Sequence, residues 1–117
     1  FDMEVEWKKQ GRALTPFLTD LLGEKPTVEA VKQMSPAQYI TSEFPPVHLT
    51  TSNGDFLRKH SYRLKEVLEK KGVEVVFKDY GEKKKPQGHV FYLNLKNKVG
   101  QECNADQLEF VKQMMKK

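Results

Sequence analysis

The sequence has little cysteine and no long apolar run. Cys103 is the single cysteine among 117 residues, which excludes an intramolecular disulfide, gives no support to a cysteine-based zinc site and favours a reducing compartment. A membrane-spanning helix needs about 18 to 20 consecutive apolar residues, and no stretch approaches this length. The first residues also lack the charged-then-apolar order of a signal peptide. We therefore expect a cytoplasmic chain with no membrane span.

Neither sign of charge dominates the chain. It contains 20 Lys and Arg residues and 16 Asp and Glu residues, which give a net charge of +4, and the two signs are interspersed along most of the sequence. The run Lys83-Lys84-Lys85, with Lys116-Lys117, is the best case for an anionic partner, but such a run is usually a solvated loop and no aromatic residues alternate with it to stack bases. We expect no nucleic-acid partner. The 3 histidines lack zinc-ligand spacing, so neither a metal nor a cofactor is expected.

The length and composition indicate a single domain over residues 1–117. Residues 1–40 are expected to be mainly helical. Apolar residues at helical spacing between positions 14 and 22 end at Gly23, and a second short helix begins at Thr27, whose hydroxyl can cap it. Trp7 and Phe17 are expected to pack in the interior, with the lining of a pocket as the alternative.

Residues 41–117 alternate between strands and helices. A β-branched strand over 47–51 ends in the loop Ser52-Asn53-Gly54-Asp55, a helix runs from about 58 to 71, and a second strand covers 73–77. A strand, a helix and a strand in this order predict parallel pairing. The fold class is therefore α/β, with two or three mostly parallel strands flanked by helices.

Two further elements complete this prediction. Residues 89–93 form either a short strand or one helical turn. A final helix runs from about 104 to 116, with Asn104 as its cap. Its apolar residues, predicted to face the core, are Leu108, Val111, Met114 and Met115.

Asp55 and His89 are the candidate site residues. Each follows a predicted strand, and the carboxyl ends of parallel strands meet at one edge of a sheet, where functional residues collect. A carboxylate that holds an imidazole in one tautomer is the orienting half of a nucleophilic triad. The plainer alternatives are an aspartate that caps the next helix and a histidine that only belongs to a loop. Of the other histidines, His60 is expected in a solvent-facing or first-turn position, and His48 as a core histidine with satisfied hydrogen bonds.

A family resemblance is carried by four motifs in order: Ser35-Pro36, the stretch from Phe44-Pro45-Pro46 to Gly54-Asp55-Phe56-Leu57, the helix end Lys70-Lys71-Gly72, and Gly88-His89-Val90-Phe91. Together they resemble the C-terminal part of an α/β-hydrolase, in the carboxylesterase and lipase group related to hormone-sensitive lipase. The resemblance implies that Asp55 is the triad acid, that His89 is the triad histidine and that the substrate is a carboxylic ester. It also implies that residues 1–40 are a helical segment next to the cap.

The chain lacks the other parts of such an enzyme. A Gly-x-Ser-x-Gly nucleophile motif and a His-Gly-Gly loop for the oxyanion hole are absent. We therefore expect a C-terminal fragment of a serine hydrolase, inactive alone, whose open sheet edge pairs with the missing N-terminal part or with another copy to form a homo-oligomer. The alternative is a non-catalytic interaction or anion-binding module with the same layout. The serines, none flanked by the required glycines, are Ser35, Ser42, Ser52 and Ser61.

Overall fold

The computed structural model describes residues 3–117, which belong to two compact units, Phe1–Ile40 and Thr41–Lys117. Each unit is described by itself. That the whole chain folds as one domain stays a prediction.

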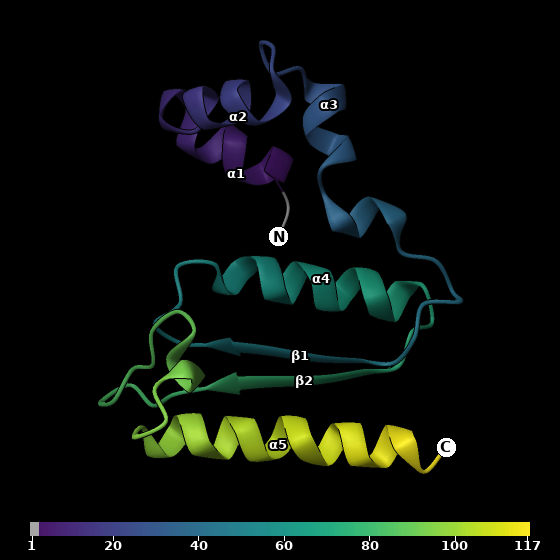
Figure 1. Cartoon of the computed structure of the whole chain (residues 1–117), viewed down its shortest axis with the longest axis vertical. Coiled ribbons are helices and arrows are strands. Elements are labelled where there is room, and N and C mark those ends of the chain that lie inside the picture. Colours follow the sequence, from purple (N-terminus) through teal and green to yellow (C-terminus); the bar gives the residue numbers. More distant parts are fainter. Residues whose placement is uncertain (1–2) are drawn as a thin grey trace. The chain divides into compact units, whose positions relative to one another are not determined.

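The first unit consists of short helices. They are α1 (Met3–Gln10), α2 (Thr15–Leu22) and α3 (Val28–Gln33), with 3-10 turns at Gly11–Ala13 and Pro36–Tyr39 (Figure 1). Leu18 and Val31 are fully buried and form its interior together with Ile40. Because these helices are too short to be stable in isolation, their helical state depends on this packing.

Both helix limits predicted in this unit are confirmed. Gly23 ends α2 with a φ of 73°, a left-handed conformation that glycine adopts without strain. The Thr27 side chain caps α3 by accepting a hydrogen bond from the Ala30 backbone N–H. Phe17, however, is 53% exposed, so its predicted interior position is wrong. Trp7 is half-buried, and its indole N–H donates to Thr15 Oγ1 at 3.1 Å.

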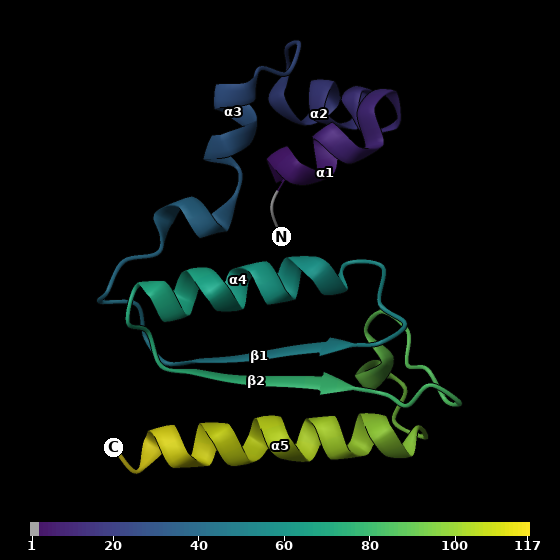
Figure 2. The same ribbon diagram turned by 180° about the vertical axis from the view of Figure 1, so that it is seen from behind.

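The second unit contains a two-stranded sheet between two helices. Strand β1 (Val47–Ser52), helix α4 (Arg58–Lys70) and strand β2 (Val75–Tyr80) follow one another, and the strands pair in parallel from Val47↔Val75 to Ser52↔Tyr80. A 3-10 turn at Phe91–Leu93 leads to helix α5 (Lys98–Met115). Helices α4 and α5 lie on opposite sides of the strands in both views (Figures 1 and 2). This arrangement confirms the α/β class.

The second strand begins two residues later than predicted. Val73 does not belong to it, because its backbone N–H bonds the Leu68 carbonyl and so completes the end of α4. The strand then continues through the polar residues Lys78 and Asp79, since they pair with Thr50 and Thr51 of β1. Long-range pairing thus overrides the low strand propensity of these residues.

The last helix begins six residues before the predicted cap, Asn104. Asn97 is the cap, and its Oδ1 accepts hydrogen bonds from Val99 N and Gly100 N. Gly100 permits this early start, because a Cβ there would lie 3.1 Å from Tyr92 Cα. The helical alternative for residues 89–93 is confirmed by the 3-10 turn.

The buried residues of this unit include Leu68 and Val73, near the start of β2, and a small cluster near the carboxyl end of the sheet. Tyr80, Phe91 and Cys103 are buried together. The predicted core-facing side of α5 is only partly correct, because Met114 is half-buried while Leu108, Val111 and Met115 are 55%, 50% and 81% exposed. A two-stranded sheet is about 10 Å wide, no wider than one helix, and cannot cover such a broad apolar face.

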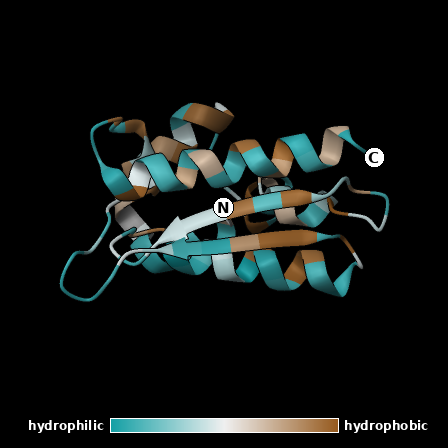
Figure 3. Cartoon of the chain, turned by 90° about the horizontal axis from the view of Figure 1, so that it is seen from below, coloured by the Kyte–Doolittle hydropathy of each residue, from teal (hydrophilic) through white to brown (hydrophobic). Residues whose placement is uncertain are grey.

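Each strand changes character along its length. The first half of β2 is apolar and its second half is mostly polar, while β1 has His48 between two apolar residues and ends in Thr-Thr-Ser (Figure 3). Polar side chains therefore gather at the edge of the sheet where the connecting loops meet. Among the helices of residues 3–117, none combines the length and apolarity needed to cross a bilayer.

Candidate functional site

Asp55 and His89 are in contact at the carboxyl end of the sheet. His89 Nδ1 lies 3.0 Å from Asp55 Oδ1 and 3.1 Å from Oδ2, although the residues are 34 positions apart. An ionised carboxylate only accepts hydrogen bonds, so Nδ1 is the protonated nitrogen of the neutral ring. Nε2 is then left with its lone pair, and within residues 3–117 it has no hydrogen-bond partner. The structure thus brings together the two predicted site residues.

The turn after β1 holds Asp55 in place. Its backbone N–H donates to the Ser52 carbonyl at 3.1 Å, and its Oδ1 accepts from the Leu57 N–H at 2.8 Å. The side chain is only 13% exposed. Asp55 therefore forms the turn that leads into α4 and also contacts His89. The two roles considered for this residue, capping the next helix and orienting the histidine, do not exclude each other.

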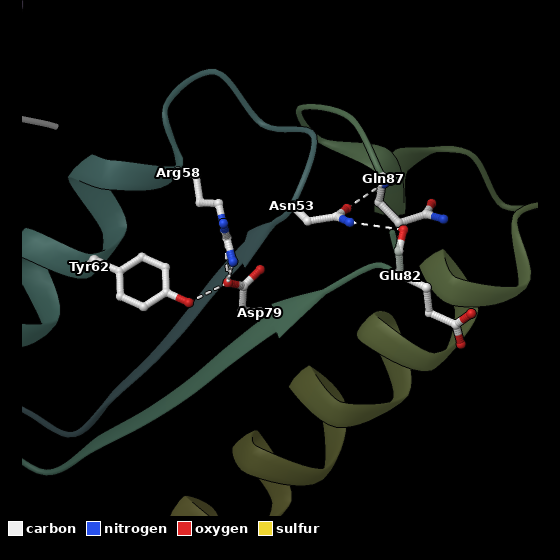
Figure 4. A network of polar contacts seen from close by, with 6 residues as sticks. All are labelled: Asn53, Arg58, Tyr62, Asp79, Glu82 and Gln87. Atoms are coloured by element: carbon white, nitrogen blue, oxygen red, sulfur yellow. Dashed lines mark hydrogen bonds and ion pairs between the residues drawn. The ribbon is translucent and has the colours of Figure 1, made fainter. Parts of the chain in front are cut away.

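Asn53 fastens the loop that carries His89. Its Oδ1 accepts from the Gln87 N–H at 2.9 Å and its Nδ2 donates to the Glu82 carbonyl at 3.0 Å (Figure 4). One side-chain amide thereby bridges both ends of the 82–87 loop. Asn53 was not among the predicted site residues, and its place directly after a strand is the only signal in the sequence that points to it.

Two hydrogen bonds to backbone carbonyls complete this attachment. The Gly54 N–H donates to the Gln87 carbonyl at 2.8 Å, and Ser52 Oγ donates to the Gly88 carbonyl at 3.1 Å. A Cβ on Gly54 would lie 2.5 Å from the Gln87 oxygen, so only glycine permits this approach. We call the contacts of Ser52, Asn53 and Gly54 with the second loop the loop clamp.

The loop clamp also reaches the start of α5. Gln87 Oε1 accepts a hydrogen bond of 2.7 Å from Asn97 Nδ2. Asn97 is the cap of that helix. The ends of β1 and β2 and the beginning of α5 are thus joined by side-chain amides, which limits how far His89 can move from Asp55.

Backbone strain and an aromatic ring lie next to His89. Val90 has a φ of 51° and a ψ of 34°, a left-handed conformation that is rare for a β-branched residue and costs about 1 to 3 kcal/mol. The Phe56 ring lies 5.0 Å from the His89 ring, centroid to centroid, and is 68% exposed. An open hollow of about 430 Å³ lies between Asp55, Phe56 and the first turns of α4.

A second carboxylate near the same edge has different partners. Asp79 Oδ2 accepts from Arg58 Nε at 2.9 Å, from Arg58 Nη2 at 2.6 Å and from the Tyr62 hydroxyl (Figure 4). These bonds to Asp79 raise the pKa of Arg58 and of Tyr62. The charge of Asp79 is thus already compensated by groups that do not titrate near neutral pH.

The other two histidines correct two expectations. The first-turn position predicted for His60 is confirmed, whereas the solvent-facing alternative is wrong, because His60 is 5% exposed and lies two turns before the buried Leu68 on the same helix face. His48 Nδ1 is 3.3 Å from Thr50 Oγ1, but its buried Nε2 has no partner among the described residues. Its hydrogen bonds are therefore not all satisfied, and burial lowers the pKa of the ring.

The described residues place no nucleophile beside His89. Ser52 is buried and donates to a carbonyl, and within residues 3–117 no hydroxyl or thiol hydrogen-bonds the His89 ring. Cys103 is fully buried, and this burial raises the pKa of its thiol. A thiol of that kind is unreactive.

Comparison with known proteins supplies no relative. No protein-family model, no curated protein and no solved structure matches this chain. The function is therefore inferred from the residues of this chain and from the geometry of the site.

Proposed function

We propose that this chain supplies the acid and the histidine of a serine hydrolase that cleaves carboxylic esters. The observation that supports the proposal is the 3.0 Å contact between His89 Nδ1 and Asp55 Oδ1 at the carboxyl ends of two parallel strands. In such sheets the carboxyl ends are where catalytic side chains gather. The family resemblance of the sequence motifs points in the same direction.

The chemistry of the pair follows from its hydrogen bond. Asp55 holds His89 with the proton on Nδ1, so Nε2 can accept the proton of an attacking serine. The same nitrogen then returns a proton to the leaving alcohol. While the ring is cationic, the carboxylate stabilises it without taking its proton. His89 is thus the general base and then the general acid, and Asp55 orients it.

On this proposal the 117 residues are a C-terminal fragment, and the nucleophile comes from a Gly-x-Ser-x-Gly segment outside them. The oxyanion donors also lie elsewhere, and each is worth about 2.7 to 4 kcal/mol of transition-state stabilisation. We therefore expect the 117-residue chain to have no esterase activity above background. Its open sheet edge pairs with the nucleophile-bearing segment or with another copy.

The test compares two proteins, the 117-residue chain and the product of the longer reading frame that contains it. Hydrolysis of p-nitrophenyl acetate and labelling by a fluorophosphonate probe are measured on both. We expect activity and labelling only in the longer protein. There, Asp55→Asn should reduce kcat by about 10⁴-fold, while Asp79→Asn, the matched carboxylate variant, should leave kcat within a few-fold of the unmodified value.

Two outcomes would overturn the proposal. One is a longer reading frame without an upstream Gly-x-Ser-x-Gly segment, and the other is esterase activity that does not respond to Asp55→Asn. Turnover by the 117-residue chain that disappears in His89→Ala would instead show that the nucleophile lies within it.

The second candidate is a non-catalytic interaction module. The observation that favours it is the exposure of apolar side chains on α5, which a partner could cover. Absence of the nucleophile motif from the longer reading frame would select this alternative.

A further inference from the structure

Helix α5 has two unlike flanks. On the β1 side, Leu108, Val111 and Met115 recur at helical spacing and are 55%, 50% and 81% exposed. On the β2 side, Glu109 and Gln113 line a hollow with Lys78 and Asp106. One flank is therefore apolar and uncovered, while the other is polar and suited to water.

The apolar flank borders a trough beside β1. One hollow of about 430 Å³ lies between His48 and Thr50 of the strand and Gln107 and Phe110 of the helix. A second hollow of about 480 Å³ shares Phe110 and Val111 with it. The other residues that line the second hollow are Pro45, Pro46, Met114, Met115 and Lys117. The two hollows are neighbours along α5, and we call them together the trough.

The backbone of β1 has free groups at this edge. Val47 N donates to the Glu74 carbonyl and Asn53 N to the Tyr80 carbonyl, so the odd-numbered residues point toward β2. In a parallel ladder the alternate residues then direct their N–H and C=O groups away from the partner strand. These residues are His48 and Thr50, and among residues 3–117 no further strand pairs with this outer edge.

The two edges of the sheet differ in protection. Charged side chains on an edge strand prevent further pairing, and β2 carries Lys78 and Asp79. The accessible part of β1, residues 47–50, contains neither a charged residue nor a proline. Pairing is therefore expected at β1.

We propose that a second copy of this chain occupies the trough, with the two β1 strands antiparallel about a twofold axis at Leu49. His48 of each copy then pairs with Thr50 of the other, and both N–H and both C=O groups are satisfied. The axis stands perpendicular to the sheet, so both copies of α5 lie on the same face. A self-complementary contact of this kind closes as a dimer.

The spacing of the helices supports a second copy. Neighbouring strands lie about 4.8 Å apart, and α5 contacts residues of both β1 and β2. With α5 centred over its own two strands, the two α5 axes would be about 10 Å apart, which is the distance at which helices pack. The exposed Leu108, Val111 and Met115 of each copy would meet there. The inference rests on the proposed function in one respect: the β1 edge is free in the 117-residue chain, whereas the nucleophile-bearing segment could cover it in the longer protein. It uses neither Asp55 nor His89, so a monomeric 117-residue chain would leave the proposed function standing.

Sedimentation equilibrium of the 117-residue chain over a range of concentrations tests the proposal. We expect a reversible dimer, and a dissociation constant at least about tenfold higher in Val111→Lys, because two charges would be buried at the axis. Thr50→Pro should also give a monomer, since its N–H is not used in pairing with β2. Glu109→Lys, on the opposite flank of α5, is the matched control and should remain dimeric.

Circular dichroism of each variant shows whether it is folded. Val111 is 50% exposed, so its substitution tests the interface even if Thr50→Pro fails to fold. A chain that is monomeric at every concentration would overturn the proposal. So would a dimer that persists in folded Val111→Lys, or one that Glu109→Lys dissociates to the same extent.

Discussion

Two aspartates near the same edge of the sheet illustrate how partners decide what a carboxylate can do. Asp55 follows β1 and contacts His89, whereas Asp79 lies in β2 and is bound by Arg58 and Tyr62. A guanidinium keeps its proton throughout the physiological range, while an imidazole gives it up near neutrality. Of the two pairs, only that of Asp55 contains a ring with one nitrogen that donates and one that accepts a hydrogen bond.

The two pairs also differ in what holds them together. Arg58 and Tyr62 project from α4 one turn apart and reach a strand that the helix already covers. Asp55 and His89 belong to two separate loops, which the loop clamp of Ser52, Asn53 and Gly54 joins. The first arrangement is a property of helix packing, and the second depends on a few hydrogen bonds. Substitutions should therefore break one pair without the other.

The largest effect is expected from Gly54→Ala. The added Cβ would lie 2.5 Å from the Gln87 carbonyl oxygen, so the loops must separate, at a cost of about 1 to 3 kcal/mol. Urea unfolding measures this loss. Gly88→Ala is the matched control, because a Cβ at Gly88 meets no atom within 4 Å. Equal unfolding midpoints for the two variants would show that the clamp does not require glycine at position 54.

A gain in stability is expected from Val90→Asn. Asparagine tolerates the left-handed conformation better than a β-branched residue, so the strain at a φ of 51° should be relieved by about 1 kcal/mol. Thermal unfolding of this variant is compared with that of Leu93→Asn, an exposed neighbour in the 3-10 turn. If the two substitutions change the midpoint equally, Val90 is not strained.

A smaller, pH-dependent effect is expected from His48. Burial lowers its pKa below the ordinary value of 6.5, and Lys78 acts in the same direction while Asp106 opposes them. As the pH falls below 6.5, His48 therefore binds a proton more readily in the unfolded chain than in the folded chain. The free energy of unfolding consequently decreases as the pH falls. Urea midpoints at a series of pH values should show this slope, and His48→Asn should reduce it. An unchanged slope would assign the dependence to other groups.

The smallest change in stability, and the sharpest separation of the two pairs, is expected from the aspartate variants. Asp79→Asn should lower the pKa of Tyr62 toward its ordinary value of 10.0, because the bond to Asp79 is the main cause of the raised pKa. Asp55→Asn should leave Tyr62 unchanged but allow the proton of His89 to move to Nε2. Long-range ¹⁵N–¹H spectra report the tautomer. A tautomer that responds to Asp79→Asn and not to Asp55→Asn would contradict the assignment.

Much of the second unit could be predicted from local pattern. The β-branched run at 47–51, the amphipathic pattern from 58 onward and Gly72 set β1 and α4 within one residue of their observed bounds. The placement of Asp55 and His89 at one edge of the sheet followed from their positions after consecutive parallel strands. Both depend on interactions between residues close in sequence or on a general property of parallel sheets.

The predictions of helix limits and burial were wrong where residues distant in the sequence determine the structure. The start of α5 at Lys98 depends on Asn97 and on close packing of Gly100 against Tyr92. The buried position of His60 and the exposed positions of Leu108 and Val111 depend on how much of each helix the narrow sheet covers. Periodicity identifies an apolar face but does not say whether anything lies against it.

The sequence by itself determined which segments are strands and helices and placed a carboxylate and an imidazole after consecutive strands. Only the tertiary structure decided that the loops are joined closely enough for the two side chains to touch, that Asp79 is already paired with Arg58, and that the sheet of residues 3–117 has two strands rather than three. The reason is physical. Secondary structure depends mainly on neighbours along the chain, whereas a hydrogen bond between loops requires positions correct to a few tenths of an ångström, which only the packed fold supplies.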